Sequence, residues 1–391
     1  MPTDSFRSAI SSMVIRPRLV LLDTSHINAI VKDLISSDVA RQSTARAFIP
    51  TLLSRGWLPV LCLHQLFEVL QYHDDSQVDA RVRFLQSLPA AAWVTSATAP
   101  GEMGSVVDVL RAEISAAHGT PGAEVSEIRD LAREKILAFG TGIEAVPANF
   151  RRWRDLRPAL AEHEQRARAI TAIAPWRGAE IDDTLMSQWI GQPLRSSDES
   201  SSALLEMEAR LTKEIEARGD RRISDPAAVA KAFFEDIARR GDDVVAQQPS
   251  SPAVQFLLCE GLEEGDIDPN ATLGQVFDLI QFRKRLSVAA EEMGLSWPEV
   301  KARVHRERLP TTLITGMIRR YGQDQPERKG SDLNDTSLLC LAPYADVTYV
   351  DKRTLENVRR AKAKNAQFGQ LVGTVRKAGQ YQTILDELSD G

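Results

Sequence analysis

Five acidic side chains stand where a buried element of an α/β sheet is expected to begin or end. Asp23 follows the apolar run RLVLL, and Asp351 follows the run VTYV. Glu68 lies on a helical pattern after the second apolar run, while Asp332 and Asp335 bracket the start of the helix before VTYV. Ligands of open parallel sheets collect at the carboxyl ends of the strands. With the usual right-handed crossovers, these acids can converge on one edge of the sheet.

The chemistry of such a cluster favours a divalent cation. Carboxylates packed together repel one another, and without a cation some of them must bind protons with a raised pKa. An all-oxygen donor set prefers Mg²⁺ or Mn²⁺ to zinc, and the six histidines are scattered without zinc spacing. A bound ion of this kind activates water and offsets the charge that develops on a phosphodiester. Hydrolysis of nucleic acid is therefore a natural use of these residues.

The elements that would position the acids alternate between strand and helix in the first 96 residues. We expect strands at 18–24, 58–61 and 90–96, and helices that open at Thr24, cover 39–54, carry Leu66 to Leu70 and cover about 77–87. Continuous apolar runs of this length suit strands that are buried on both faces of a parallel sheet. Gly56 stands where a glycine would end the second helix.

The alternation halts after residue 96 and resumes near residue 331. Between them we find helical periods, with a helix start at Asp225 and Pro226 and a loop or internal boundary expected at SSDESSS (196–202) and at QQPSSP (247–252). A fourth strand is expected at 347–350 and a helix at 354–366, followed by a final strand and helix. The prediction is an α/β core in two parts, 1–96 and 331–391, with a helical insertion, 97–330, between the third and fourth strands.

The acidic constellation resembles that of PIN-domain nucleases. LLDTS with Asp23, the helical Glu68, SDLND with Asp332 and Asp335, and VTYVD with Asp351 match the family in order and context over residues 16–96 and 331–391. The resemblance implies a PIN-like parallel sheet sandwiched by helices and a metal-dependent endoribonuclease that cleaves single-stranded RNA. It implies Mg²⁺ or Mn²⁺ bound by Asp23, Glu68, Asp335 and Asp351.

The same resemblance leaves two acids for the third catalytic position. Asp335 is favoured because it directly precedes the apolar helix, and Asp332 is the alternative. It also makes Ser25 a supporting polar group near the substrate. Lys352 and Arg353 follow Asp351 directly and would neutralise substrate phosphates.

Each residue also has a purely structural interpretation. Asp23 and Asp335 fit helix N-caps, Glu68 fits a half-exposed helix position, and Asp351 fits the start of a loop. Lys352 and Arg353 fit a solvated helix face equally well.

Composition bounds the remaining choices. The 43% hydrophobic and 26% charged fractions are those of a soluble globular chain, and three distant cysteines suit a reducing cytosol. We find no secretory leader and no apolar span of membrane length. The net charge of -6 means that local patches must carry any binding of nucleic acid.

Several functions therefore remain to be compared. The first is an endoribonuclease, with a toxin or defence effector as one form of it, for which RNA is preferred over DNA and the span 97–330 selects a substrate or a protein partner. The second is a DNA or structure-specific nuclease, and the third is a PIN-like scaffold that binds without cutting. A phosphatase using Asp23 as nucleophile is disfavoured, because such enzymes carry a second Asp where this chain has Ser25.

Overall fold

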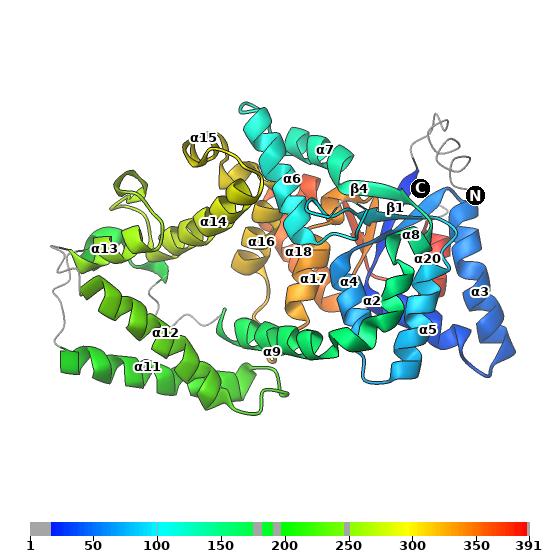
Figure 1. Ribbon diagram of the computed structural model, residues 1–391, viewed down its shortest axis with the longest axis horizontal. Coiled ribbons are helices and arrows are strands. Elements are labelled where there is room, and N and C mark those ends of the chain that lie inside the picture. Colours follow the sequence, from blue (N-terminus) through cyan, green and yellow to red (C-terminus); the bar gives the residue numbers. More distant parts are fainter. Residues whose placement is uncertain (1–16, 100, 175–181, 191–196, 246–250, 389–391) are drawn as a thin grey trace. The chain divides into compact units, whose positions relative to one another are not determined.

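The chain forms two compact units in a computed structural model that describes residues 17–99, 101–174, 182–190, 197–245 and 251–388. The larger unit comprises Met1–His163, Arg303–Gln323 and Leu333–Gly391, and the smaller comprises Glu164–Ala302 and Asp324–Asp332. Figure 1 labels many of the elements of both. The predicted division at residues 96 and 330 stays a prediction, and each unit is described by itself.

A mixed, mostly parallel sheet lies at the centre of the larger unit. Its six strands are β1 (Arg18–Leu22), β2 (Trp57–Leu61), β3 (Ala91–Val94), β4 (Leu137–Gly140), β5 (Val347–Tyr349) and β6 (Thr374–Arg376). Their order is β4-β3-β2-β1-β5-β6, and among the described strands only β4 runs antiparallel to its neighbour. The chain is thus an α/β protein, as the alternating pattern predicted.

The strand β4 contradicts one expectation. We expected only helices in the span 97–330, but Leu137–Gly140 pairs antiparallel with β3 and widens the sheet. The large helical region of the chain consequently lies between β4 and β5. Only Phe139 in the run LAFG favours a strand, so its extended conformation depends mainly on its pairing with β3.

Helices cover both faces of this sheet. They are α2 (Thr24–Leu34), α3 (Val39–Ser54), α4 (Leu63–Leu70), α5 (Asp75–Gln86), α6 (Val106–Gly119), α7 (Val125–Ile136), α8 (Gly142–Ala145), α16 (Pro310–Tyr321), α17 (Asp332–Leu339), α18 (Lys352–Lys364), α19 (Ala366–Leu371) and α20 (Tyr381–Glu387). Short 3₁₀ turns, η1 (Ala148–Leu156), η4 (Arg306–Arg308) and η5 (Ala342–Tyr344), join some of them.

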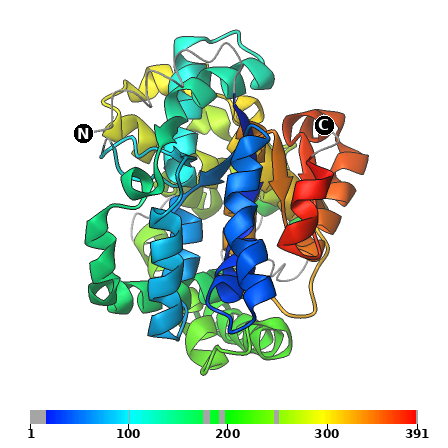
Figure 2. The same ribbon diagram turned by 90° about the vertical axis from the view of Figure 1, so that its right-hand side faces the viewer.

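Alternate residues of β1 define the two layers of the core. Val20 and Leu22 pack in a cluster with residues of α2, α3, α5 and α20, whereas Leu19 and Leu21 pack with residues of α6, α7 and α17. Figure 2 shows α3 and α20, in blue and red, next to each other although they come from opposite ends of the chain. All four strand residues are at most 4% exposed, as expected for a parallel strand covered on both faces.

Strand order reverses between β1 and β5. The chain passes from β1 to β2 and β3 on one side, and β5 and β6 lie on the other side of β1. Asp23 follows β1 and Asp351 follows β5, and the Asp23 N–H donates to the carbonyl of Tyr349 at 3.0 Å. This reversal is the topological switch point at which open α/β sheets bind ligands.

The smaller unit is helical, with two apolar clusters. It contains most of α9 (Arg157–Ile173) and of α15 (Trp297–Arg303), together with α10 (Met186–Ile190), α11 (Ser197–Arg218), α12 (Pro226–Val245), α13 (Pro252–Cys259), the 3₁₀ turn η3 (Glu264–Asp266) and α14 (Leu273–Glu292). One cluster joins α9, α11 and α12, and the other joins α10, α13 and α14.

Two local expectations for this unit have opposite outcomes. Helix α12 begins at Pro226 and the Asp225 carboxylate accepts the N–H of Ala228 at 2.8 Å, so the predicted start is confirmed. The loop expected at 196–202 is wrong, because α11 already begins at Ser197. Serine, Asp and Glu are favourable in the first turn of a helix, so this composition marked a helix start.

No helix in the described ranges is both long and apolar enough to cross a membrane.

Candidate acidic site at the carboxyl edge of the sheet

Four carboxyl groups from four separate segments interact at the carboxyl edge of the sheet. Burial, and then the charges of Asp23, Asp351 and Glu68, raise the pKa of Asp335 from 3.8 to about 8. The nearby Arg353 acts in the opposite direction. Because the charges of the other three residues all act on Asp335, we treat the four as one group, which we call the acidic cluster.

Asp23 and Asp351 each cap the helix that follows them. One oxygen of Asp23, Oδ1, accepts the N–H of Ser25 at 2.7 Å, and Oδ1 of Asp351 accepts the N–H of Thr354 at 2.6 Å. The structural interpretation of Asp23 is therefore correct, and Asp351 starts a helix rather than a loop. Each capping bond uses one oxygen of the carboxylate. Capping and ligand binding are compatible at both positions.

Glu68 projects from α4 and is held by an amide. The Asn334 side chain donates from Nδ2 to Oε1 of Glu68 at 3.0 Å, across 266 residues of sequence. Burial raises the pKa of Glu68 and Asp23 raises it further, while the bond from Asn334 lowers it. The bond from Asn334 therefore favours the charged form of Glu68, although burial leaves the pKa of this carboxyl raised overall.

Gln65 fixes the first turn of α4 against the end of β1. Its carbonyl oxygen accepts the N–H of Cys62 at 2.9 Å, and its amide donates to the carbonyl of Leu22, the residue before Asp23. Gln65 is only 3% exposed. A buried amide with both ends satisfied is a rigid link, so the spacing between the Glu68 helix and Asp23 is set by this side chain.

Asp335 lies inside a helix and faces a cation. We expected it to begin the apolar helix, but α17 begins at Asp332 and places Asp335 in its first turn. The guanidinium of Arg353 lies 3.3 Å from Oδ2 of Asp335, with side-chain exposures of 24% and 22%. Arg353, predicted to contact substrate phosphates, is therefore the counter-ion of Asp335 in this structure.

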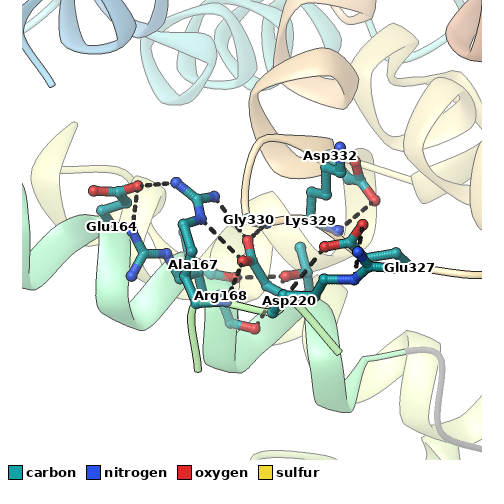
Figure 3. A network of polar contacts seen from close by, with 11 residues as sticks. Glu164, Ala167, Arg168, Asp220, Glu327, Lys329, Gly330 and Asp332 are labelled. Carbon is teal, nitrogen blue, oxygen red and sulfur yellow. Dashed lines mark hydrogen bonds and ion pairs between the residues drawn. The ribbon is translucent and has the colours of Figure 1, made fainter. Parts of the chain in front are cut away.

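Asp332 participates in the polar network of the smaller unit. Its carboxylate accepts the N–H of Lys329 at 3.1 Å, and the adjoining Gly330 donates its N–H to Asp220 at 3.1 Å (Figure 3). Asp220 is 4% exposed and also accepts the guanidinium of Arg222, which holds the pKa of this carboxyl well below its usual range. The network anchors the segment 324–332 to the turn between α11 and α12.

Ser25 and Lys352 have exposed side chains at the edge of the cluster. Ser25 lies in the first turn of α2, and its backbone N–H, rather than its hydroxyl, contacts Asp23. Lys352 is the first residue of α18. Both are accessible to a bound ligand.

The residue types of the acidic cluster suit a hard divalent cation, but their spacing in this structure does not. Carboxylates, with an amide beside them, are ligands that Mg²⁺ and Mn²⁺ prefer. Among the residues that the structure describes, however, no group of three or more His, Cys, Asp or Glu side chains is arranged to hold a metal ion. Binding of a cation would require Asp335 to part from Arg353, or water molecules to bridge the carboxylates.

Asn334 and Gln65 were not among the residues predicted from the sequence. Asn334 lies in the quoted segment SDLND, one residue before Asp335, and Gln65 lies one helical turn before Glu68. Polar residues beside candidate acids, on the same helix face or the next position, are the signal that would have indicated both.

Comparisons with family models, with curated protein sequences and with solved structures found no match to this chain.

Proposed function

We propose that the protein is a PIN-like, divalent-metal-dependent nuclease that hydrolyses the phosphodiester bonds of single-stranded RNA. One observation carries the proposal: Asp23, Glu68, Asp335 and Asp351, which span 328 positions of sequence, interact in one cluster beside the switch point of the sheet. A protein gains no stability from gathering like charges, so the cluster has a use that offsets the repulsion. The preference for RNA rests on the resemblance to PIN-domain nucleases.

The side chains divide the work. Asp23, Glu68, Asp335 and Asp351 would hold Mg²⁺ or Mn²⁺, directly or through water, and the ion would activate water and offset phosphate charge. Asp23 and Asp351 keep Oδ2 available while Oδ1 caps a helix. The bond from Asn334 favours the charged form of Glu68, and Arg353 would be the counter-ion of Asp335 until a cation replaces it. Asp332 remains the alternative third acid, and Ser25 and Lys352 would contact the substrate.

A second candidate is a PIN-like scaffold that binds RNA or protein without cutting. The ion pair between Arg353 and Asp335 favours it, because an arginine is a permanent positive charge beside the acids. The lack of a ligand-spaced group among the described residues also favours it. A protein partner for the helical span stays a prediction under both candidates.

The test compares cleavage and metal binding in matched variants. Purified protein is incubated with end-labelled single-stranded RNA or DNA of one sequence, with Mn²⁺, with Mg²⁺ or with EDTA. Asp23→Asn should abolish cleavage and weaken Mn²⁺ binding measured by calorimetry. The control is Asp38→Asn, which alters another aspartate N-cap, that of α3, where Asp38 accepts the N–H groups of Ala40 and Arg41. Asparagine caps helices about as well as aspartate, so both variants should fold.

Four outcomes decide between the candidates. The nuclease is supported if RNA cleavage requires Mn²⁺ and is lost in Asp23→Asn but not in Asp38→Asn. Cleavage of DNA in preference to RNA corrects the substrate. Full activity in Asp23→Asn or in EDTA overturns the assignment of the acidic cluster, and RNA binding without cleavage identifies the scaffold.

A further inference from the structure

A basic hollow lies in the larger unit between α18 and β6. Its volume is about 480 Å³. Four cationic side chains line it, namely Lys352, Arg359, Arg376 and Lys377, with two acids, Glu356 and Glu387. We call it the α18–β6 hollow. Positions 352, 356 and 359 lie one helical turn apart on α18, so the helix presents this charged face as a stripe.

The acids of the hollow are already engaged. Glu387 accepts the hydroxyl of Tyr349 at 3.0 Å, and its backbone carbonyl accepts the guanidinium of Arg376 at 2.9 Å. Glu356 lies 3.7 Å from Arg360, which does not line the hollow, and 4.0 Å from Arg359.

Two lysines of the hollow remain available. Within the described ranges, Lys352 and Lys377 are exposed and make no hydrogen bond or ion pair with the protein. The hollow therefore presents cations that the protein itself does not neutralise, and its formal charge is positive although the chain as a whole is acidic. A local positive potential on an acidic protein attracts polyanions to that place.

The hollow and the acidic cluster share one edge of the sheet. Tyr349 of β5 is in register with Arg376 of β6, and the N–H of Val350 donates to the carbonyl of Arg376 at 2.9 Å. Asp351 follows Val350, and Lys377 follows Arg376, so both chains leave the sheet at the same level. Lys352 is adjacent to Asp351 in the chain and lines the hollow.

We propose that the α18–β6 hollow binds phosphates of a single-stranded nucleic acid and guides the strand to the acidic cluster. This inference rests on the proposed nuclease function, and it assigns a binding place to the part of the strand that is not cut. Contacts between lysine or arginine and phosphate fix the register of a strand without reading bases. Binding at the hollow is therefore indifferent to base sequence, shared by RNA and DNA, and weakened by salt as counterions are released.

The test measures binding apart from cleavage. A fluorescein-labelled single-stranded RNA of mixed sequence, and the DNA of the same sequence, are titrated with protein in EDTA and followed by fluorescence anisotropy at several salt concentrations. The variant is Lys377→Glu. Its matched control is Lys32→Glu, which reverses an exposed lysine of α2 that likewise makes no hydrogen bond or ion pair within the described ranges.

We expect Lys377→Glu to weaken binding of both strands about tenfold at moderate salt, because one phosphate contact is lost and a repulsion is added. The negative slope of log affinity against log salt concentration should become shallower by about one. Lys32→Glu should change affinity less than about twofold, and inorganic phosphate should compete with the strand for wild-type protein.

The outcomes separate this inference from the proposed function. Equal affinities for Lys377→Glu, Lys32→Glu and wild type overturn the inference, even if the protein cuts RNA with Mn²⁺. Weakened binding in Lys377→Glu alone supports it, and it still does so if wild-type protein fails to cut, in which case only the nuclease proposal fails.

Discussion

The buried carboxyl group of Glu113 should make the larger unit less stable as pH rises from about 4.5 to about 7. Glu113 is fully buried on α6, where it accepts the backbone N–H and the hydroxyl of Thr311 at 3.1 and 2.6 Å. The hydroxyl of Tyr344 donates to it at 2.6 Å. Burial raises its pKa from 4.5 to about 7, and the bonds from Thr311 and Tyr344 only partly offset this shift.

The size and sign of the effect follow from linkage. Below the unfolded pKa, Glu113 is protonated in both states and contributes its full stability. As pH rises, the unfolded chain loses its proton first, so stability falls until the folded group ionises near pH 7. A shift of this size, at about 1.4 kcal/mol for each pKa unit, corresponds to a loss of about 3 kcal/mol. Tyr344 faces Glu113 and its own pKa is raised by burial and by this carboxyl, so it stays neutral and does not compensate.

The assay is urea unfolding of wild type and Glu113→Gln in EDTA, between about pH 4 and pH 8. All other titrating groups are common to both proteins, so the difference between the two free energies isolates Glu113. Because glutamine does not ionise, that difference should move by about 3 kcal/mol in favour of Glu113→Gln across the range. A difference that stays constant within about 1 kcal/mol, or moves the other way, would refute the reasoning.

Three further predictions concern the acidic cluster and the smaller unit. Burial and three like charges raise the pKa of the Asp335 carboxyl to about 8, so Asp335→Asn should raise the thermal midpoint in EDTA at pH 8. The same variant should abolish cleavage. A lower midpoint would contradict this account. Asn334→Ala removes a hydrogen bond that lowers the pKa of Glu68, so the acidic limb of a plot of cleavage rate against pH should move to higher pH. An unshifted limb would exclude a role for Asn334 in positioning Glu68. Asp220→Asn removes the negative charge that buried Asp220 presents to the half-exposed Arg222 and to the N–H of Gly330. It should cost about 1 to 3 kcal/mol and speed hydrogen exchange in the segment 324–332; unchanged exchange there would show that the contact is dispensable.

Local chemistry made several elements predictable from sequence. Helix α3 covers Val39–Ser54 as expected, because Asp38 caps its start and Gly56, with a φ of +77°, ends the connection after it. Strand β1 was recognisable because four consecutive buried residues, Leu19–Leu22, leave no polar alternation. In both cases the deciding interactions lie within a few residues of the element itself.

Other features depend on distant partners and had no local signal. Strand β4 follows α7 without a break, and it is mainly its pairing with β3 that makes Leu137–Gly140 extended. The placement of Asp23 and Asp351 at strand ends could be derived from topology, but the partners of Glu68 and Asp335 could not. Asn334 and Arg353 reach those acids through rotamers that the folded surroundings select, and sequence spacing does not encode rotamers.

The pairing of β1 with β5 has a consequence for how the chain reaches its native state. Val20 is paired with Val347, 327 positions later, and closing a flexible loop of that length costs about 5 kcal/mol of chain entropy beyond a constant. The smaller unit occupies a little less than half of the intervening chain, and its prior collapse shortens the effective loop and lowers that cost. We therefore expect helices of the smaller unit to form early and the acidic cluster to assemble last, which delays the approach of its charges until the surrounding chain can hold them.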